Sequence, residues 1–112
     1  MICRPITNRT RIAILAALSV LSNSALAATG PSFHGVPLAC IHSAAHRYGL
    51  RASLLLAILR TEDGRIGTVS PDPNGTDDLG PAQINTCHLP FLERYGYTFR
   101  TLADNPCANI AA

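Results

Sequence analysis

The stretch that decides the fold is ASLLLAILRTEDG, residues 52–64. Its apolar residues recur at the helical spacing i, i+3 and i+4, and a carboxylate follows at i+7: Leu55, Ile58, Leu59 and Glu62. This spacing predicts an amphipathic helix over 52–63, which Gly64 is expected to end. On this pattern Glu62 continues an apolar stripe that faces the core.

Glu62 breaks two local rules of helix chemistry. A charge rarely ends an apolar stripe, and a carboxylate in the last turn opposes the negative end of the helix dipole, at a cost of about 0.3–1 kcal/mol. Such violations are typical of functional sites. A half-buried carboxylate against leucines is expected to have a raised pKa and to donate a proton near neutral pH. The alternative is a helix-end glutamate that is exposed or paired with Arg65.

The first 27 residues have the organisation of a cleavable signal peptide. Three arginines precede a short apolar run over 12–21, and the sequence Ala-Leu-Ala at 25–27 matches the small-residue cleavage pattern. The apolar run is too short to cross a bilayer comfortably. The sequence therefore predicts a periplasmic or otherwise exported protein, cleaved after Ala27, with no membrane span in its mature part.

Removal of the signal peptide changes the charge balance. All nine basic residues are arginines and three lie in the signal, which leaves six arginines against seven carboxylates, a formal net charge of −1. There is no basic run, and the few aromatic residues do not alternate with arginine, so the pattern excludes a nucleic-acid-binding protein. The remaining length, residues 28–112, allows one small domain.

Three cysteines remain after cleavage, in a compartment that permits disulfides. They are Cys40, Cys87 and Cys107, which allow one bridge and leave one thiol. We favour a bridge from Cys40 to Cys107, because it ties the first helix to the last residues and contributes about 4 kcal/mol in the chain-entropy model. The two pairings that use Cys87 remain open at this point.

The rest of the mature chain divides into a lead-in, a loop and short helices. Composition predicts a flexible lead-in over 28–37 and a long irregular loop over 64–80, in which the pair Asn74-Gly75 favours a small hairpin. The helical segments expected besides 52–63 are a first helix over 38–48 closed by Gly49, a helical turn over 82–86, a third helix over 89–95 ended by Gly96, and a fourth that starts at 105–106. The fold class expected is a small, mainly α domain.

The loop and the residues that follow it carry further candidates for chemistry. Gly80 precedes two amide side chains, Gln83 and Asn85, which suit hydrogen bonds to sugar hydroxyl and acetamido groups. The alternative is that these amides anchor their own loop. A second carboxylate for a two-acid glycosidase would come from the aspartates of the loop at 72, 77 and 78, which are more typical of turns.

Two patterns resemble metal sites but are incomplete. His42 and His46 stand four apart on one helix face and lack a third ligand. Alternating oxygen-bearing residues over 72–78 resemble a calcium loop, but its glycine falls at the fourth position and Gln83 occupies the twelfth. The sequence predicts no metal and no other cofactor.

Taken in order, the motifs resemble one known family. They are Cys40 with a short helix, Tyr48-Gly49, the helix from Leu54 to Glu62, the loop NGTDDLGPAQIN over 74–85, Leu89-Pro90, Tyr95-Gly96 and Asn105-Pro-Cys107. This series, from about Cys40 to Ile110, resembles the soluble lytic transglycosylase family. It is most similar to the small exported members that accompany type III and type IV secretion, conjugation and pilus systems.

The resemblance implies a lysozyme-like, mainly helical domain of the α+β superfamily that cuts peptidoglycan between N-acetylmuramic acid and N-acetylglucosamine. Glu62 would be the single acid and base, and the acetamido group of the substrate would take the place of a protein nucleophile. Gly80, Gln83 and Asn85 would line the glycan groove. Cys40 and Cys107 would correspond to the pair that is bridged in the small exported members.

The sequence departs from the family pattern in three places. Asp63 stands where serine usually follows the catalytic glutamate, and Pro81-Ala82 replaces the usual pair after Gly80. The chain also stops before the Ala-Tyr-Asn-Ala-Gly motif of the family, so we expect a partial domain over 38–112 that lacks the C-terminal helices of the family. Two other functions therefore stay open: a lysozyme-type hydrolase on the same glycan, and a non-catalytic peptidoglycan-binding or scaffold protein.

Overall fold

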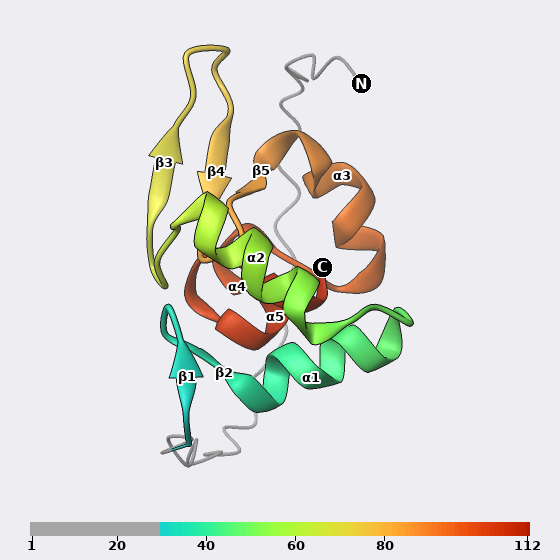
Figure 1. Ribbon diagram of the computed structural model, residues 1–112. Coiled ribbons are helices and arrows are strands. Elements are labelled where there is room, and N and C mark those ends of the chain that lie inside the picture. Colours follow the sequence, from blue (N-terminus) through green and yellow to red (C-terminus); the bar gives the residue numbers. More distant parts are fainter. Residues whose placement is uncertain (1–29) are drawn as a thin grey trace, which may run out of the picture.

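The computed structural model describes residues 30–112, so the predicted signal peptide lies outside the described part of the chain. Its helices are α1 (Leu38–Arg47), α2 (Ala52–Glu62), α3 (Leu89–Leu92), α4 (Phe99–Asp104) and α5 (Pro106–Ala111), with 3₁₀ turns η1 (Thr86–His88) and η2 (Glu93–Tyr95) (Figure 1). Its strands are β1 (Ser32–Phe33), β2 (Val36–Pro37), β3 (Val69–Pro71), β4 (Asp77–Leu79) and β5 (Ile84–Asn85). The domain therefore combines short helices with two small antiparallel sheets. None of the helices within 30–112 has the length and hydropathy needed to cross a membrane.

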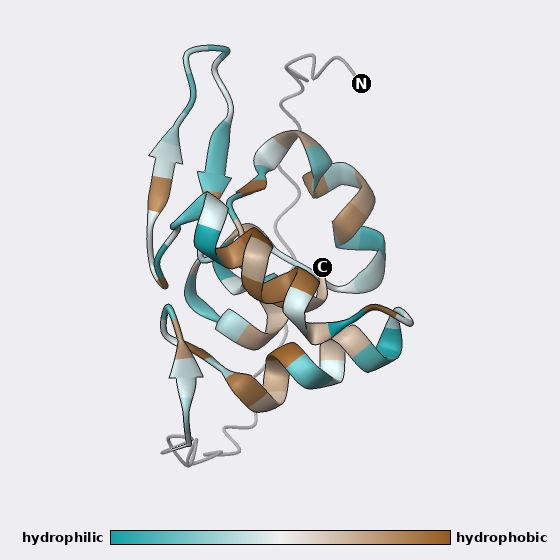
Figure 2. Cartoon of the chain, in the orientation of Figure 1, coloured by the Kyte–Doolittle hydropathy of each residue, from teal (hydrophilic) through white to brown (hydrophobic). Residues whose placement is uncertain are grey.

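Helices α1 and α2 form an antiparallel pair at the centre of the first core cluster. Gly49 closes α1 with a φ of 64°, the left-handed conformation that was predicted for it. The turn that follows is short, and the two helices pack against each other as expected. Ile41 of α1 lies against Leu55 and Leu59 of α2, all buried, and Figure 2 shows the hydrophobic residues of the two helices side by side.

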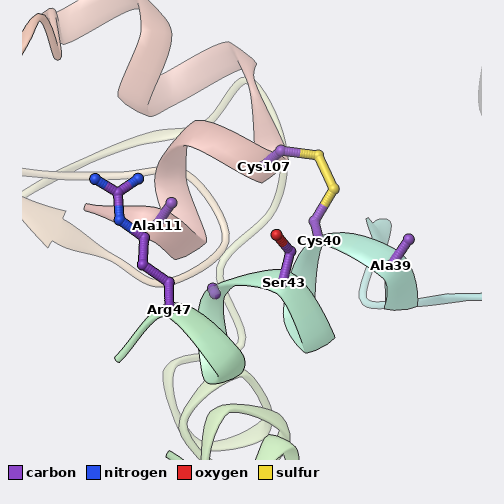
Figure 3. A pocket seen from close by; sticks show the side chains of 7 residues that line it. Ala39, Cys40, Ser43, Arg47, Cys107 and Ala111 are labelled. Carbon is purple, nitrogen blue, oxygen red and sulfur yellow. A yellow bond between two sulfur atoms is a disulfide. The ribbon is translucent and has the colours of Figure 1, made fainter. Parts of the chain in front are cut away.

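The last helix, α5, completes this cluster. It packs against both α1 and β2, and its Ile110 is buried. A disulfide joins Cys40 of α1 to Cys107 of α5, which confirms the favoured pairing (Figure 3). The bridge borders an open hollow of about 250 Å³ between the two helices. No cysteine of residues 30–112 is free, so the expectation of a leftover thiol at Cys87 is wrong.

A three-stranded sheet and the C-terminal half carry the second cluster. Strands β3, β4 and β5 are antiparallel neighbours in that order, and the predicted hairpin at Asn74-Gly75 is confirmed, with Gly75 at a φ of 82°. Leu79 of β4 packs on Leu92 of α3 and Leu102 of α4. This half is connected to the first cluster through α5, which packs on α4 as well as on α1.

Several predicted segments differ from the structure. Part of the expected flexible lead-in forms the hairpin β1–β2, in which Val36 is fully buried. The helical turn expected over 82–86 is instead β5 followed by η1, because residues 84–85 pair with β4. The third helix appears as α3 and η2 and ends at Gly96 as predicted. Helix α4 was not predicted; its start at Thr98 has a capping box with Thr101.

Candidate functional site

Glu62 is the last residue of α2, and its side chain is exposed. The prediction that Glu62 is half-buried is wrong, because only part of the predicted apolar stripe faces the core. Leu55 and Leu59 are buried, whereas Ile58 is 39% exposed. Glu62 instead ends an exposed line of residues four apart, Leu54, Ile58 and Glu62. Its carboxylate makes no hydrogen bond or ion pair with any described residue. The group is therefore open to a ligand.

Asp63 ends the helix, one residue earlier than the predicted stop at Gly64. It has the left-handed conformation, with φ 47° and ψ 25°, and its amide donates to the Leu59 carbonyl at 3.1 Å. Aspartate is one of the few residues besides glycine that adopt this conformation readily. The chain consequently turns sharply directly after Glu62.

Gly64 is required for a close contact rather than for its backbone angles. A Cβ at this position would overlap the Gly80 carbonyl oxygen and would lie 2.7 Å from Nε2 of Gln83 and 2.8 Å from the Pro81 carbonyl oxygen. Such distances do not occur for real Cβ atoms, so only glycine allows loop 80–83 to rest on the residue two places after Glu62. Two segments far apart in the sequence thus meet at the end of α2.

A buried asparagine on α5 holds this loop in place. Asn109 is 1% exposed, and its Nδ2 donates to the carbonyls of Leu79 and Leu102, each at 2.8 Å. Its Oδ1 accepts from the Ala82 amide at 2.7 Å. Gly80, at a φ of 63°, packs against the same asparagine and helix α4. Sequence reasoning missed Asn109, whose one signal was an amide beside the apolar Ile110 in a helix that packs on the core.

The two amide side chains predicted to bind substrate have different surroundings. Gln83 has a φ of 51°, and its Nε2 donates to the Gly80 carbonyl at 2.8 Å. The Gln83 carboxamide oxygen has no partner in the described part of the chain, so it can accept a hydrogen bond from a ligand. Asn85 is committed to the sheet: its Nδ2 donates to Thr76 and Asp78, and its Oδ1 accepts from the Cys87 amide.

The hydrogen bonds of the hairpin aspartates run within the sheet, its turn and the adjoining η1. Asp77 and Asp78 belong to β4, and the Asp78 carboxylate accepts from Asn85 across the sheet. Asp72 lies in the hairpin turn, where its backbone bonds to Thr76 and Gly75. Among residues 30–112, no group of three or more histidine, cysteine, aspartate or glutamate side chains could hold a metal ion.

The site that the structure assembles thus consists of Glu62, the Asp63–Gly64 turn and the loop with Gly80 and Gln83. It offers one exposed carboxylate for proton transfer and an amide for hydrogen bonding to a ligand. It brings together three of the four residues predicted from the sequence, Glu62, Gly80 and Gln83, and leaves Asn85 as an anchor of the neighbouring sheet.

Comparison with known proteins relates the chain to proteins of Shigella and Salmonella. No protein-family model matches it. It is similar to protein IpgF of Shigella flexneri, with 36% identity over 72 residues, which are 63% of this chain and 47% of IpgF. It is also similar to the invasion protein IagB of Salmonella typhimurium, with 29% identity over 72 residues, 63% of this chain and 45% of IagB. The chain spans about half the length of the curated relatives it matches.

Proposed function

We propose that the protein is a peptidoglycan lytic transglycosylase that cleaves the bond between N-acetylmuramic acid and N-acetylglucosamine, with Glu62 as its acid and base. One observation carries the proposal: loop 80–83 packs on Gly64 and brings the Gln83 amide to the end of α2 that bears the exposed Glu62. A carboxylate beside an amide-bearing loop suits a substrate rich in hydroxyl and acetamido groups.

The proposed reaction needs one carboxyl group in two successive roles. Glu62 first gives its proton to the glycosidic oxygen as the bond to the muramyl C1 breaks, and the acetamido group of the substrate stabilises the cationic carbon. The Glu62 carboxylate then takes the proton of the muramyl 6-hydroxyl, whose oxygen bonds to C1 and closes the 1,6-anhydro ring. The carboxyl group is thereby restored. No second carboxylate is required, in agreement with the hydrogen bond that occupies Asp78.

The relatives support a role in a secretion or invasion apparatus. One of them is named an invasion protein, and the resemblance of the motifs is to small exported enzymes that serve type III and type IV secretion, conjugation or pilus systems. Local opening of the peptidoglycan layer for such an apparatus is the role that we propose, with the periplasm as its location. The glycan strand is the substrate, and no cofactor takes part.

Detection of 1,6-anhydromuropeptides after incubation with purified peptidoglycan tests this proposal. The wild-type protein should release them, and Glu62→Gln should lower the rate about 10²- to 10⁴-fold, the usual contribution of a general acid or base. Glu93→Gln is the matched control, since Glu93 is an exposed glutamate of η2. The proposal fails if wild type releases no anhydro product or if Glu62→Gln releases as much. Products with reducing muramic ends would identify a lysozyme-type hydrolase instead.

A second candidate function is non-catalytic binding of peptidoglycan. The observation in its favour is the exposure of Glu62, whose carboxylate has no hydrogen bond or ion pair with a described residue that would orient it for proton transfer. A binding protein would sediment with intact peptidoglycan sacculi and release no product. In that case Gln83→Ala would weaken sedimentation, whereas Glu62→Gln would leave it unchanged.

A further inference from the structure

Three residues other than glycine have a left-handed backbone within the described residues, and all three meet at the end of α2. They are His34, Asp63 and Gln83, with φ values of 50°, 47° and 51°. Asp63 follows Glu62, and Gln83 packs on Gly64. Such positions cost about 1–3 kcal/mol each and tend to cluster at functional sites. The third residue, His34, lies in the turn of the hairpin β1–β2, and the sequence did not predict that this turn lies near Glu62.

The His34 imidazole contacts Asp63 directly. Its Nδ1 lies 3.2 Å from Oδ1 of Asp63, and the two side chains are 27% and 64% exposed. The ring also lies against Phe33, with centroids 4.5 Å apart, and Phe33 packs on the first core cluster. The imidazole is therefore held from one side by the core and from the other by the residue after Glu62.

A second contact joins the same turn to the same segment. A Cβ at Gly35 would lie 3.1 Å from Cδ1 of Ile66, so the β1–β2 turn touches the chain at both residue 63 and residue 66. Figure 1 shows this turn beside the segment that leads from α2 into β3. His34 and Gly35 both have positive φ, as a type I′ turn requires. The turn thus contacts the chain on both sides of Gly64, the residue against which loop 80–83 packs.

We propose that His34 is a positioning residue of the Glu62 site. Its 3.2 Å contact with the Asp63 carboxylate holds the left-handed residue that directs the chain out of α2, and it thereby fixes Glu62 relative to loop 80–83. The catalytic consequence rests on the proposed function, whereas the positioning itself does not. Asp63 has a defined part in this arrangement, because its carboxylate is the group that the His34 imidazole contacts.

Two substitutions at position 34 separate the polar contact with Asp63 from the conformation of the turn. Glycine and asparagine both suit the first position of a type I′ turn, and both remove the ring contact with Phe33. Asparagine alone keeps a donor, since its Nδ2 stands at the same place along the side chain as Nδ1 of histidine. We expect His34→Gly to lower kcat about two- to fivefold with KM little changed, in line with the energy of a partly exposed pair, and His34→Asn to restore most of the rate.

Asp63→Gly provides a second test of the proposal, because glycine keeps the left-handed conformation and removes the carboxylate that His34 contacts. It should reproduce the loss seen with His34→Gly, and the double variant should show no further loss. Hydrogen exchange of the backbone amide at position 63, which donates to the Leu59 carbonyl, should accelerate by a similar factor in both single variants once each rate is divided by the intrinsic rate for its sequence. This exchange tests the positioning even if the protein has no glycan-cleaving activity. Equal rates for His34→Gly and His34→Asn, additive losses in the double variant or unchanged exchange would overturn the proposal.

Discussion

Replacement of Asn109 by alanine should destabilise the domain more than any other single change to a polar side chain near the site. The structure supplies the magnitude: the substitution removes three hydrogen bonds at 2.7–2.8 Å, from a side chain that is 1% exposed. At about 1 kcal/mol net for each bond, the expected loss is about 3 kcal/mol. A domain of this size has a free energy of unfolding of only about 4–12 kcal/mol.

Thermal unfolding followed by circular dichroism measures this loss. For a domain of this size, 1 kcal/mol corresponds to about 4–8 °C, so Asn109→Ala should lower Tm by about 12–24 °C. Asn105→Ala is the matched control on the same helix. Asn105 is exposed and caps α5 by accepting from the amides of Cys107 and Ala108, both at 3.0 Å, and its loss should cost about 1 kcal/mol.

Asn109→Asp sharpens the test, because it keeps an acceptor for the Ala82 amide. It replaces the two donated hydrogen bonds by a carboxylate oxygen that faces two carbonyl oxygens. At neutral pH it should therefore be at least as destabilising as alanine. If Asn109→Ala lowers Tm no more than Asn105→Ala does, the reasoning that assigns the loop position to Asn109 is refuted.

Two further predictions concern the frame around the site. Gly64→Ala should lower the free energy of unfolding by more than about 2 kcal/mol in chemical denaturation, because its Cβ would overlap the Gly80 carbonyl. The control Gly49→Ala should cost only about 1 kcal/mol, since Gly49 has a positive φ but nothing within 4 Å of the added Cβ. Similar losses in the two variants would contradict the packing argument. Joint replacement of Cys40 and Cys107 by serine should lower the free energy of unfolding by about 4 kcal/mol, because the bridge closes a loop with a sequence separation of 67. A loss below about 1 kcal/mol in the same denaturation experiment would show that the bridge does not restrain the unfolded chain.

Elements with strong local signals could be predicted from the sequence. Gly49 and Gly96 both end helical segments in the left-handed conformation that glycine tolerates, and Asn74-Gly75 forms the hairpin turn that this pair favours. Helix α2 was predicted to within one residue, since its spacing of leucines is unambiguous. The cysteine bridge also agrees with the favoured pairing.

The features that depend on tertiary contacts could not be predicted. Periodicity identified an apolar side of α2, but two adjacent lines of residues satisfy it, and only packing against α1 decides that Leu59 is buried and Ile58 exposed. Strands β1 and β2 have two residues each, too few for an alternating pattern. Asn109 acts on carbonyls 7 and 30 residues away, and no local rule relates these positions.

The packing of α5 on α1 has a consequence for how the chain folds during synthesis. Helices α1 and α2 leave the ribosome first, yet Ile110, which completes their cluster, follows about 50–70 residues later. Contacts between residues so distant in sequence slow folding, because the intervening loop must close before they form. In that interval the apolar face of α1 is open to chaperones and to aggregation. The late arrival of α5 thus leaves the first cluster incomplete until nearly the whole domain has been made.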